Sequence, residues 1–156
     1  MNKLPLVFFI ILLISTSFIF LCVNIYVFPL KHAVCSGNIS FYKDGMAMRL
    51  SSKINYSHGN GILYLDGAIY NDKTITSTIS RAISFQSINV DNRFTWTSTG
   101  VTKSMEENIS SDVEKKWLLP FYTSQNSKIK IYIDRINLDS YLVSGELTPY
   151  YICSRK

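Results

Sequence analysis

The sequence predicts a mainly β protein, in which an N-terminal transmembrane helix is followed by one antiparallel meander with a short helix. Three observations support this fold class. A long segment near the N-terminus carries no charged side chain, whereas the remaining chain carries nearly all the charge. That remainder alternates apolar and polar residues over several runs, which is the pattern of strands with one buried face. Turn-forming residues separate these runs at intervals that suit consecutive antiparallel strands.

The N-terminal segment, residues 4–30, is dominated by Leu, Ile, Phe and Val. As a helix rising about 1.5 Å per residue it would reach roughly 40 Å, which exceeds the hydrocarbon core of about 30 Å. The alternative is a cleaved signal peptide, whose apolar core has only about 7 to 15 residues and ends at a small-x-small site. His32-Ala33-Val34, which precedes Cys35, makes a poor cleavage site. We therefore predict an uncleaved transmembrane helix over residues 4–30, with residues 1–3 as a cytoplasmic N-terminus.

Basic residues lie on both sides of the apolar segment, so charge does not decide its orientation in the membrane. The cysteines give separate evidence about the compartment. Cys22 falls within the predicted span, whereas Cys35 and Cys153 lie near opposite ends of the remaining chain. A Cys35–Cys153 disulfide would close a loop worth about 4 to 5 kcal/mol on the chain-entropy model. Two unrelated thiols are the alternative. A disulfide requires an oxidising compartment, so we expect residues 31–156 to form an exported, β-rich domain.

The strands are expected where the alternation is strongest. Asp44-Gly45 and His58-Gly59 supply hairpin turns, and Asn71-Asp72 and Asp91-Asn92 supply the next ones. The strands that follow the first hairpin turn are predicted over residues 46–56, 62–70, 74–90, 93–101, 128–137 and 140–153.

Arg81 and residues 104–116 depart from the strand pattern. Arg81 occupies a position that the alternation of its strand assigns to the apolar face. Either its side chain faces a cavity filled with water, or a β-bulge shifts the register of the strand there. Residues 104–116 could form a short helix, acidic at its start and basic at its end as the helix dipole prefers. Trp117 to Phe121 would then return to the core. We expect the adjacent carboxylates Glu106 and Glu107 to be solvated.

The side chains that could carry chemistry are few. His32 and His58 are the two histidines of the chain, which leaves little material for a metal site or a catalytic triad. We expect no enzymatic activity, no metal and no cofactor. The basic residues are scattered, so direct nucleic-acid binding is not expected.

The amphipathic side chains suit a partner surface or an apolar-ligand pocket instead. Ordinary strand-face positions are the alternative for the aromatic ones. The candidate residues are Tyr64, Tyr70, Arg81, Trp96, Trp117, Tyr132 and Tyr141.

The order of features resembles the FidL-like membrane proteins of enteric bacteria. The resemblance rests on one apolar segment, the cysteine after it, the Ile79-Ser80-Arg81 run, Trp117-x-x-Pro120-Phe121, and a closing strand that ends Tyr151-Ile152-Cys153. It covers nearly the whole chain. It implies a lipocalin-like partial barrel in the periplasm, anchored by one pass in the bacterial inner membrane.

The resemblance also implies a role. FidL-like proteins accompany a ToxR-like transcriptional regulator that spans the membrane once. The expected function is to bind and modulate that regulator through its periplasmic domain, with a bile-like or fatty molecule as a possible shared ligand. With about three residues before its span, the chain would have to pass any signal through such a partner. Two alternatives stay open: a stand-alone periplasmic module that binds an apolar small molecule, and a structural envelope or assembly factor.

Overall fold

The computed structural model of the chain describes residues 4–27, 32–90, 93–146 and 149–155. The chain divides into two compact units, Met1–Lys31 and His32–Lys156. Three sequence predictions lie outside the described residues: the N-terminus at residues 1–3, the end of the predicted span at residues 28–30, and the turn at Asp91-Asn92.

The first unit contains the helix α1, Leu4–Val27. Two of its hydroxyl groups bond within the helix, since Ser15 and Thr16 both donate hydrogen bonds to the carbonyl oxygen of Leu12, at 2.9 and 3.0 Å. Within the described residues, no helix meets the combination of length and apolar character that crossing a membrane requires. The predicted helix is therefore observed, and its role as a transmembrane span stays a prediction.

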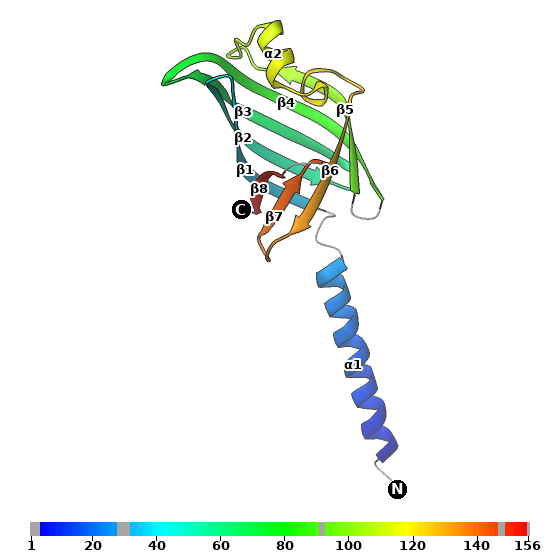
Figure 1. Ribbon diagram of the computed structural model, residues 1–156. Coiled ribbons are helices and arrows are strands. Elements are labelled where there is room, and N and C mark those ends of the chain that lie inside the picture. The colour runs from blue at the N-terminus through cyan, green and yellow to red at the C-terminus, as the bar shows by residue number, and fades with distance from the viewer. Residues whose placement is uncertain (1–3, 28–31, 91–92, 147–148, 156) are drawn as a thin grey trace. The chain divides into compact units, whose positions relative to one another are not determined.

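The second unit is a closed barrel of eight antiparallel strands, in which each strand pairs with its neighbours in sequence and β1 meets β8. Figure 1 shows the strands β1 to β5 as long and β6 to β8 as short. The meander is confirmed, and the partial barrel expected from the resemblance proves to be closed. The strands are β1 His32–Lys43, β2 Met46–Ser57, β3 Asn60–Asn71, β4 Thr74–Val90, β5 Arg93–Lys103, β6 Lys128–Arg135, β7 Ser140–Ser144 and β8 Pro149–Arg155.

Two tight turns set the register of the first three strands. Asp44 and Gly45 have φ angles of 52° and 74°, and His58 and Gly59 have 47° and 80°. Two consecutive positive φ angles are what a two-residue hairpin turn of type I′ needs. Both predicted turns are confirmed, and the pairs Lys43↔Met46 and Ser57↔Asn60 flank them.

The core fills the inside of the barrel. Leu50, Leu65 and Ile83 are buried, while their neighbours along each strand are more exposed. This is the period of two that the sequence shows. Aromatic rings continue the core: Phe85 and Trp96 stack with centroids 4.2 Å apart.

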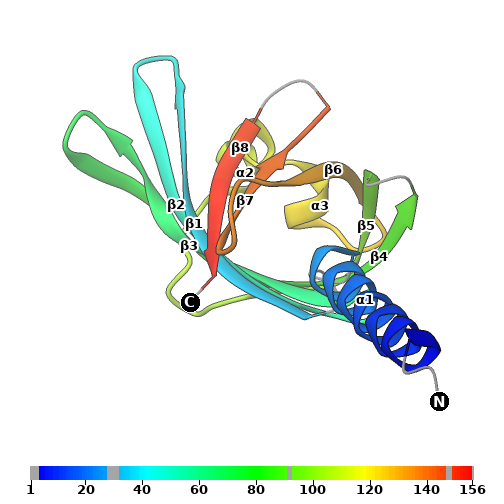
Figure 2. The same ribbon diagram turned by 90° about the horizontal axis from the view of Figure 1, so that it is seen from below.

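Two predicted elements differ in extent. The last predicted strand, residues 140–153, is divided into β7 and β8, with Gly145 after the first part and Pro149 opening the second. Proline cannot donate to a ladder inside a sheet, which is why it stands at a strand start. The helix predicted within residues 104–116 is shorter than that stretch, α2 Ser111–Trp117, and a further short helix that was not predicted, α3 Pro120–Thr123, follows it. Figure 2 shows α3 within the ring of strands, where Phe121 packs against Phe85 and Trp96.

The seam between β1 and β8 closes the barrel with a short ladder. Two residue pairs join these strands, Cys35↔Arg155 and Ser36↔Ser154. The predicted disulfide is present at this point, with the Cys35 and Cys153 Cα atoms 5.4 Å apart. Next to it, Gly37 lies so close to β8 that an added Cβ would stand 2.3 Å from the Ile152 carbonyl oxygen. The seam therefore depends on a covalent bond and on the absence of a side chain at Gly37.

Candidate functional site

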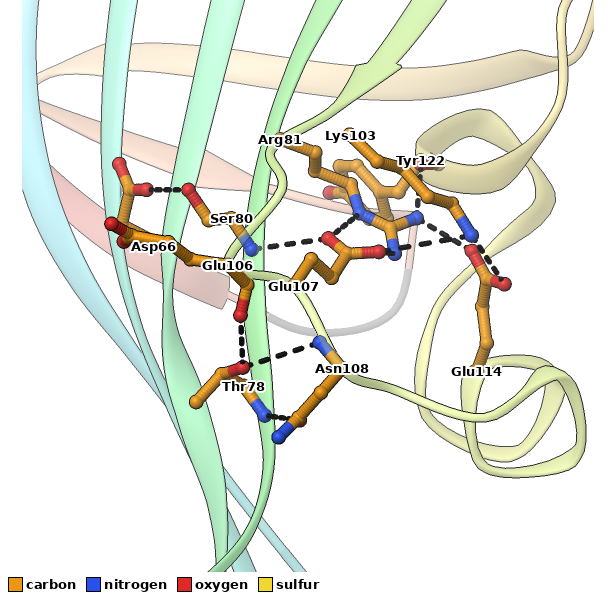
Figure 3. Close-up of polar contacts among 10 residues, drawn as sticks. All are labelled: Asp66, Thr78, Ser80, Arg81, Lys103, Glu106, Glu107, Asn108, Glu114 and Tyr122. Atoms are coloured by element: carbon orange, nitrogen blue, oxygen red, sulfur yellow. Dashed lines mark hydrogen bonds and ion pairs between the residues drawn. The ribbon is translucent and has the colours of Figure 1, made fainter.

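A segment between β5 and β6, residues 104–124, covers one part of the barrel and is called the cap segment here. Strand β4 pairs with β5 only from Arg81 onward, where Arg81 faces Lys103. The start of the cap segment covers the preceding part of β4. The Thr78 N–H donates to Asn108 Oδ1 at 2.6 Å, and the Thr78 hydroxyl donates to the Glu106 carbonyl at 2.8 Å (Figure 3). An exposed strand edge is thereby paired without a further strand.

Arg81 ties the cap segment to the inside of the barrel. Its side chain is fully buried, and it donates from Nε to Glu107 at 3.0 Å and from Nη1 to Glu114 at 2.7 Å (Figure 3). A third bond runs from Nη1 to the Tyr122 carbonyl oxygen at 2.9 Å. One guanidinium therefore holds the first loop of the cap segment, α2 and α3 together, in the fork geometry that arginine offers.

The charges around Arg81 balance. Lys103 lies 2.9 Å from Glu114 and 3.7 Å from Glu107, so two cations meet two carboxylates. Burial of Glu114 acts to raise its pKa, but hydrogen bonds from Lys103 and Arg81 outweigh burial and hold the pKa below its usual value. A second tie to the barrel is the exposed ion pair between Lys116 and Asp44, at 2.8 Å, which reaches the β1–β2 turn.

Arg81 has neither of the two surroundings that the sequence predicted for it, a bulge or a wet cavity. Arg81 keeps the inward parity of Ile79 and Ile83, and the register shifts of β4 fall elsewhere, opposite Ile69/Tyr70 and at Ser84/Phe85. No β-bulge turns Arg81 outward, and its guanidinium bonds to the carboxylates of Glu107 and Glu114 instead of facing a wet cavity. The expectation that Glu107 is solvated was wrong, since its side chain is 2 % exposed.

An apolar cavity of about 220 Å³ lies between the strands and the cap segment. Three neighbouring strands supply one wall with side chains from their inner faces. Ile39 and Phe41 come from β1, Met48 and Leu50 from β2, and Leu65 from β3. The alternation of these strands places the apolar residues here.

The cap segment supplies the opposite wall. Trp117, Leu118, Leu119 and Tyr122 line the cavity, joined by Tyr150 of β8. Burial raises the pKa of the Tyr122 hydroxyl, and the nearby Tyr151 and Tyr150 raise it further. Burial likewise raises the pKa of Tyr150. The two phenols are therefore neutral at physiological pH, and they offer hydrogen bonds without charge.

The lining of the cavity offers apolar surface and neutral hydroxyl groups. The residues that line the cavity include no carboxylate, amine, imidazole or thiol. Across the described ranges, no three His, Cys, Asp or Glu side chains gather closely enough to hold a metal ion. A pocket of this kind holds a molecule by burying its apolar surface.

The structure does not bring the seven predicted site residues to one place. Trp117 lines the cavity, and Arg81 holds the cap segment. Trp96 and Tyr141 are buried in the core. Tyr64 lies on the outer face of β3 beside an open depression that also includes Arg81 and Lys103. Tyr70 is half-buried under the Arg49 guanidinium, which lies 5.4 Å from its ring centroid, and Tyr132 is half-buried on β6.

Sequence reasoning missed most of the cavity and both carboxylate partners of Arg81. The cavity residues look like ordinary core positions in the sequence, because nothing in a strand pattern marks a face that is left incompletely filled. One signal was available for Glu107 and Glu114. An arginine at a buried strand position needs a counter-charge. Glu107 and Glu114 lie in the acidic segment that follows the β4–β5 hairpin, in which Arg81 stands.

Comparison with known proteins gives one family. The model of the YqeJ C-terminal domain matches residues 32–153, which is the barrel from the first residue of β1 to the second cysteine of the disulfide. No curated protein matches the chain. The family match covers most of the sequence, and it does not extend to the FidL-like name or to an enteric origin. The chain belongs to the YqeJ C-terminal domain family.

Proposed function

We propose that this protein is a membrane-anchored accessory or sensory subunit that binds and modulates a ToxR-like transcriptional regulator with a single span. The observation that carries the proposal is the apolar cavity, one wall of which is a segment held by ion pairs. A sensor needs an element whose position a ligand or partner can bias. The cap segment is such an element, because side-chain contacts from β4 and the β1–β2 turn hold it to the barrel.

The membrane anchor is part of this proposal. The helix α1 has no acidic residue in its first turn and no basic residue in its last, and residues 4–30 carry no charge. The Cys35–Cys153 disulfide supports an oxidising compartment for the barrel. We place α1 in a bacterial inner membrane as a single pass, with the barrel in the periplasm. Within the family, the order of residues that resembles FidL-like proteins supports an enteric bacterial source.

The test is co-purification of the full chain, in mild detergent, with the ToxR-like regulator encoded beside it. We expect a stable complex, and a faster turnover of the regulator in cells that lack this protein. A Cys153→Ser variant should weaken the complex, because the seam of the barrel loses its covalent closure. A Cys22→Ser variant is the matched control and should leave it intact. Absence of both association and regulator stabilisation would overturn the proposal.

A stand-alone binding module for an apolar small molecule is the second candidate function. The closed ring of strands favours it, because the cavity is completed by residues of this one chain. This candidate predicts ligand binding in the absence of any regulator, and no change in regulator level when the gene is deleted. A structural envelope factor, by contrast, would bind no ligand and would leave transcription unchanged on deletion.

A further inference from the structure

The two ends of the barrel carry turns of different character. Because each strand runs antiparallel to the one before it, the β4–β5 and β6–β7 turns lie at the end where β1 begins. The strand ends that flank these two turns point away from α2 in Figure 1. At the opposite end, the β1–β2 turn is Asp44-Gly45 and the β3–β4 turn is Asp72-Lys73. Those two turns have the polar composition that is usual for a turn.

Four aliphatic side chains lie instead at the β4–β5 and β6–β7 turns. Ile88 and Val90 are at the end of β4, and Ile136 and Leu138 lie between β6 and β7. Each of the four is more than half exposed. Exposed apolar residues that are scattered singly are ordinary, whereas a group of them in one place marks an interaction site.

The two turns are neighbours across β5. Val90 pairs with Arg93, the first residue of β5, and Arg93 pairs with Tyr132 of β6. Adjacent strands lie about 4.8 Å apart, so β4 and β6 are separated by about 10 Å at this level. From Tyr132, β6 continues to Arg135 and then enters its turn. The four aliphatic residues Ile88, Val90, Ile136 and Leu138 therefore form one group, called the tip patch here.

The connection of the barrel to the rest of the chain indicates what covers the tip patch. In the proposed function the uncharged segment, residues 4–30, lies in the membrane, and β1 begins at His32. The chain therefore passes from the anchor into the barrel at the end that carries the tip patch. A phospholipid surface is the apolar partner that this topology brings to that end.

The side chains beside the tip patch limit how deeply it can enter lipid. Arg93, Arg135, Asp134 and Asp139 are all exposed there, and charged groups of both signs stay among the hydrated headgroups. Tyr132 is half-buried on the same strand as Arg135, and tyrosine is enriched at the boundary between headgroups and acyl chains. This composition suits shallow insertion into the interface and excludes a span.

We propose that the tip patch inserts into the interface of the bilayer that holds α1, so that the barrel has a second, peripheral contact with phospholipid. The inference rests on the membrane anchor of the proposed function. An anchored barrel without this contact would turn freely about its linker, whereas two inserted turns fix which side of the barrel faces away from the membrane.

Spin labels on the full chain in phosphatidylcholine/phosphatidylglycerol nanodiscs test this contact. Ile88→Cys and Leu138→Cys carry the label in a Cys22→Ser background, and Ile75→Cys is the matched control, an exposed isoleucine at the opposite end of β4. Power saturation compares collisions with molecular oxygen, which enters lipid, and with a nickel chelate, which stays in water. Interfacial groups lie about 5 to 10 Å deep, so the oxygen-to-nickel ratio at both turns should be about threefold higher than at Ile75.

A second set of variants tests whether the apolar side chains cause the insertion. With the label at Ile88, the double variant Ile136→Ser/Leu138→Ser should lower the ratio about twofold, because interfacial binding scales with buried apolar area. Ile75→Ser should leave the ratio at Ile88 unchanged. These side chains are exposed, so the barrel should fold in every variant, and an unchanged midpoint of thermal unfolding checks this.

The proposal is overturned if Ile88 and Leu138 are as accessible to water as Ile75, or if the double serine variant retains the full ratio. Protection that appears only when the regulator is added would also overturn it, because the contact would then be with protein. A label on the native Cys22 of α1 separates these results from failure of the proposed function. Lipid exposure at Cys22 with water exposure at both turns would remove the tip contact and keep the anchor. Water exposure at all three positions would overturn the anchor as well.

Discussion

Arg81 and Glu107 form an ion pair across 26 residues of sequence, with both side chains withdrawn from solvent. Removing two charges from water is costly, and a buried pair often adds little net stability compared with apolar residues of similar size. The pair instead favours one arrangement of the cap segment on the barrel, because either charge strongly destabilises the protein when it is buried without its partner. The position of the cap segment on the barrel is therefore defined by charge as well as by packing.

Replacing Arg81 by Met should destabilise the protein strongly. The substitution removes both guanidinium hydrogen bonds to the buried Glu107, which among the described residues keeps only the more distant Lys103, at 3.7 Å, as a cationic partner, and it frees the Tyr122 carbonyl. Breaking a buried pair from one side costs about 3 to 5 kcal/mol. We expect that loss in the free energy of unfolding, measured by urea denaturation of the full chain in detergent. The cap segment should also become the first site of limited proteolysis.

Two variants control this experiment. Arg49→Met removes an arginine that lies on an exposed face over Tyr70, and it should cost less than about 1 kcal/mol. The double variant Arg81→Met/Glu107→Met removes both charges, and it should be more stable than Arg81→Met alone. Equal stability of the single and double variants would show that the carboxylate is not the reason for the loss.

Acid should weaken the attachment of the cap segment through Glu114. Its pKa in the folded protein lies below the ordinary value, because hydrogen bonds from Lys103 and Arg81 exceed the opposing effect of burial. A carboxyl whose folded pKa is depressed contributes stability above its unfolded pKa, which is near 4.3. That contribution is lost as the pH falls through the folded pKa. The unfolding free energy, followed from pH 7 to pH 3, should therefore decline below about pH 4.5.

Glu114→Gln should lower stability at pH 7 and flatten the decline at acid pH, because the glutamine cannot take up the proton. Glu106→Gln is the matched control, since Glu106 is exposed and its side chain makes no ion pair among the described residues. An identical acid profile for wild type and Glu114→Gln would exclude Glu114 as the titrating group.

Loss of the disulfide should loosen the whole barrel. The bond joins residues 118 apart, and a loop of that length is worth about 4 to 5 kcal/mol on the chain-entropy model. Cys153→Ser should lower the free energy of unfolding by that order, and it should abolish a faster-migrating band on non-reducing electrophoresis. Cys22→Ser should change neither measurement. Unchanged mobility together with two alkylatable thiols in the wild type would contradict the pairing.

Gly37→Ala tests the close approach of β1 and β8. The new methyl group would meet the Ile152 carbonyl and the Tyr151 ring at 2.3 and 2.4 Å, so the seam must separate locally. Overpacking of this kind costs about 1 to 3 kcal/mol, which thermal unfolding should detect as a lower midpoint. Gly100→Ala is the matched control, because nothing lies within 4 Å of an added Cβ there. A comparable loss in both variants would point to backbone effects instead.

The sequence predicts the strands well because each of them obeys a local rule. Leu50 and Ile54 alternate with polar neighbours, and Asp44-Gly45 carries the φ angles that its turn requires. The division of β7 from β8 was missed, although Gly145 and Pro149 mark it.

Arg81 shows where local rules end. Its parity signalled an anomaly, but its partners follow 26 and 33 residues later, and only the folded cap segment brings them together. The cavity could not be predicted for a similar reason. It is the space left between strands and the cap segment, and no single strand or helix sequence shows that such a space remains.

The disulfide also decides how the domain responds to mechanical force. A pull between α1 and the C-terminal end of β8 runs along the start of β1, across the bond from Cys35 to Cys153, and out through the last residues. The residues between the two cysteines are bypassed. At about 3.3 to 3.6 Å per residue, those 118 positions would otherwise add some 400 Å of extension. With the bond intact the chain transmits tension as a short tether, and six of the eight strands stay outside the path of the load.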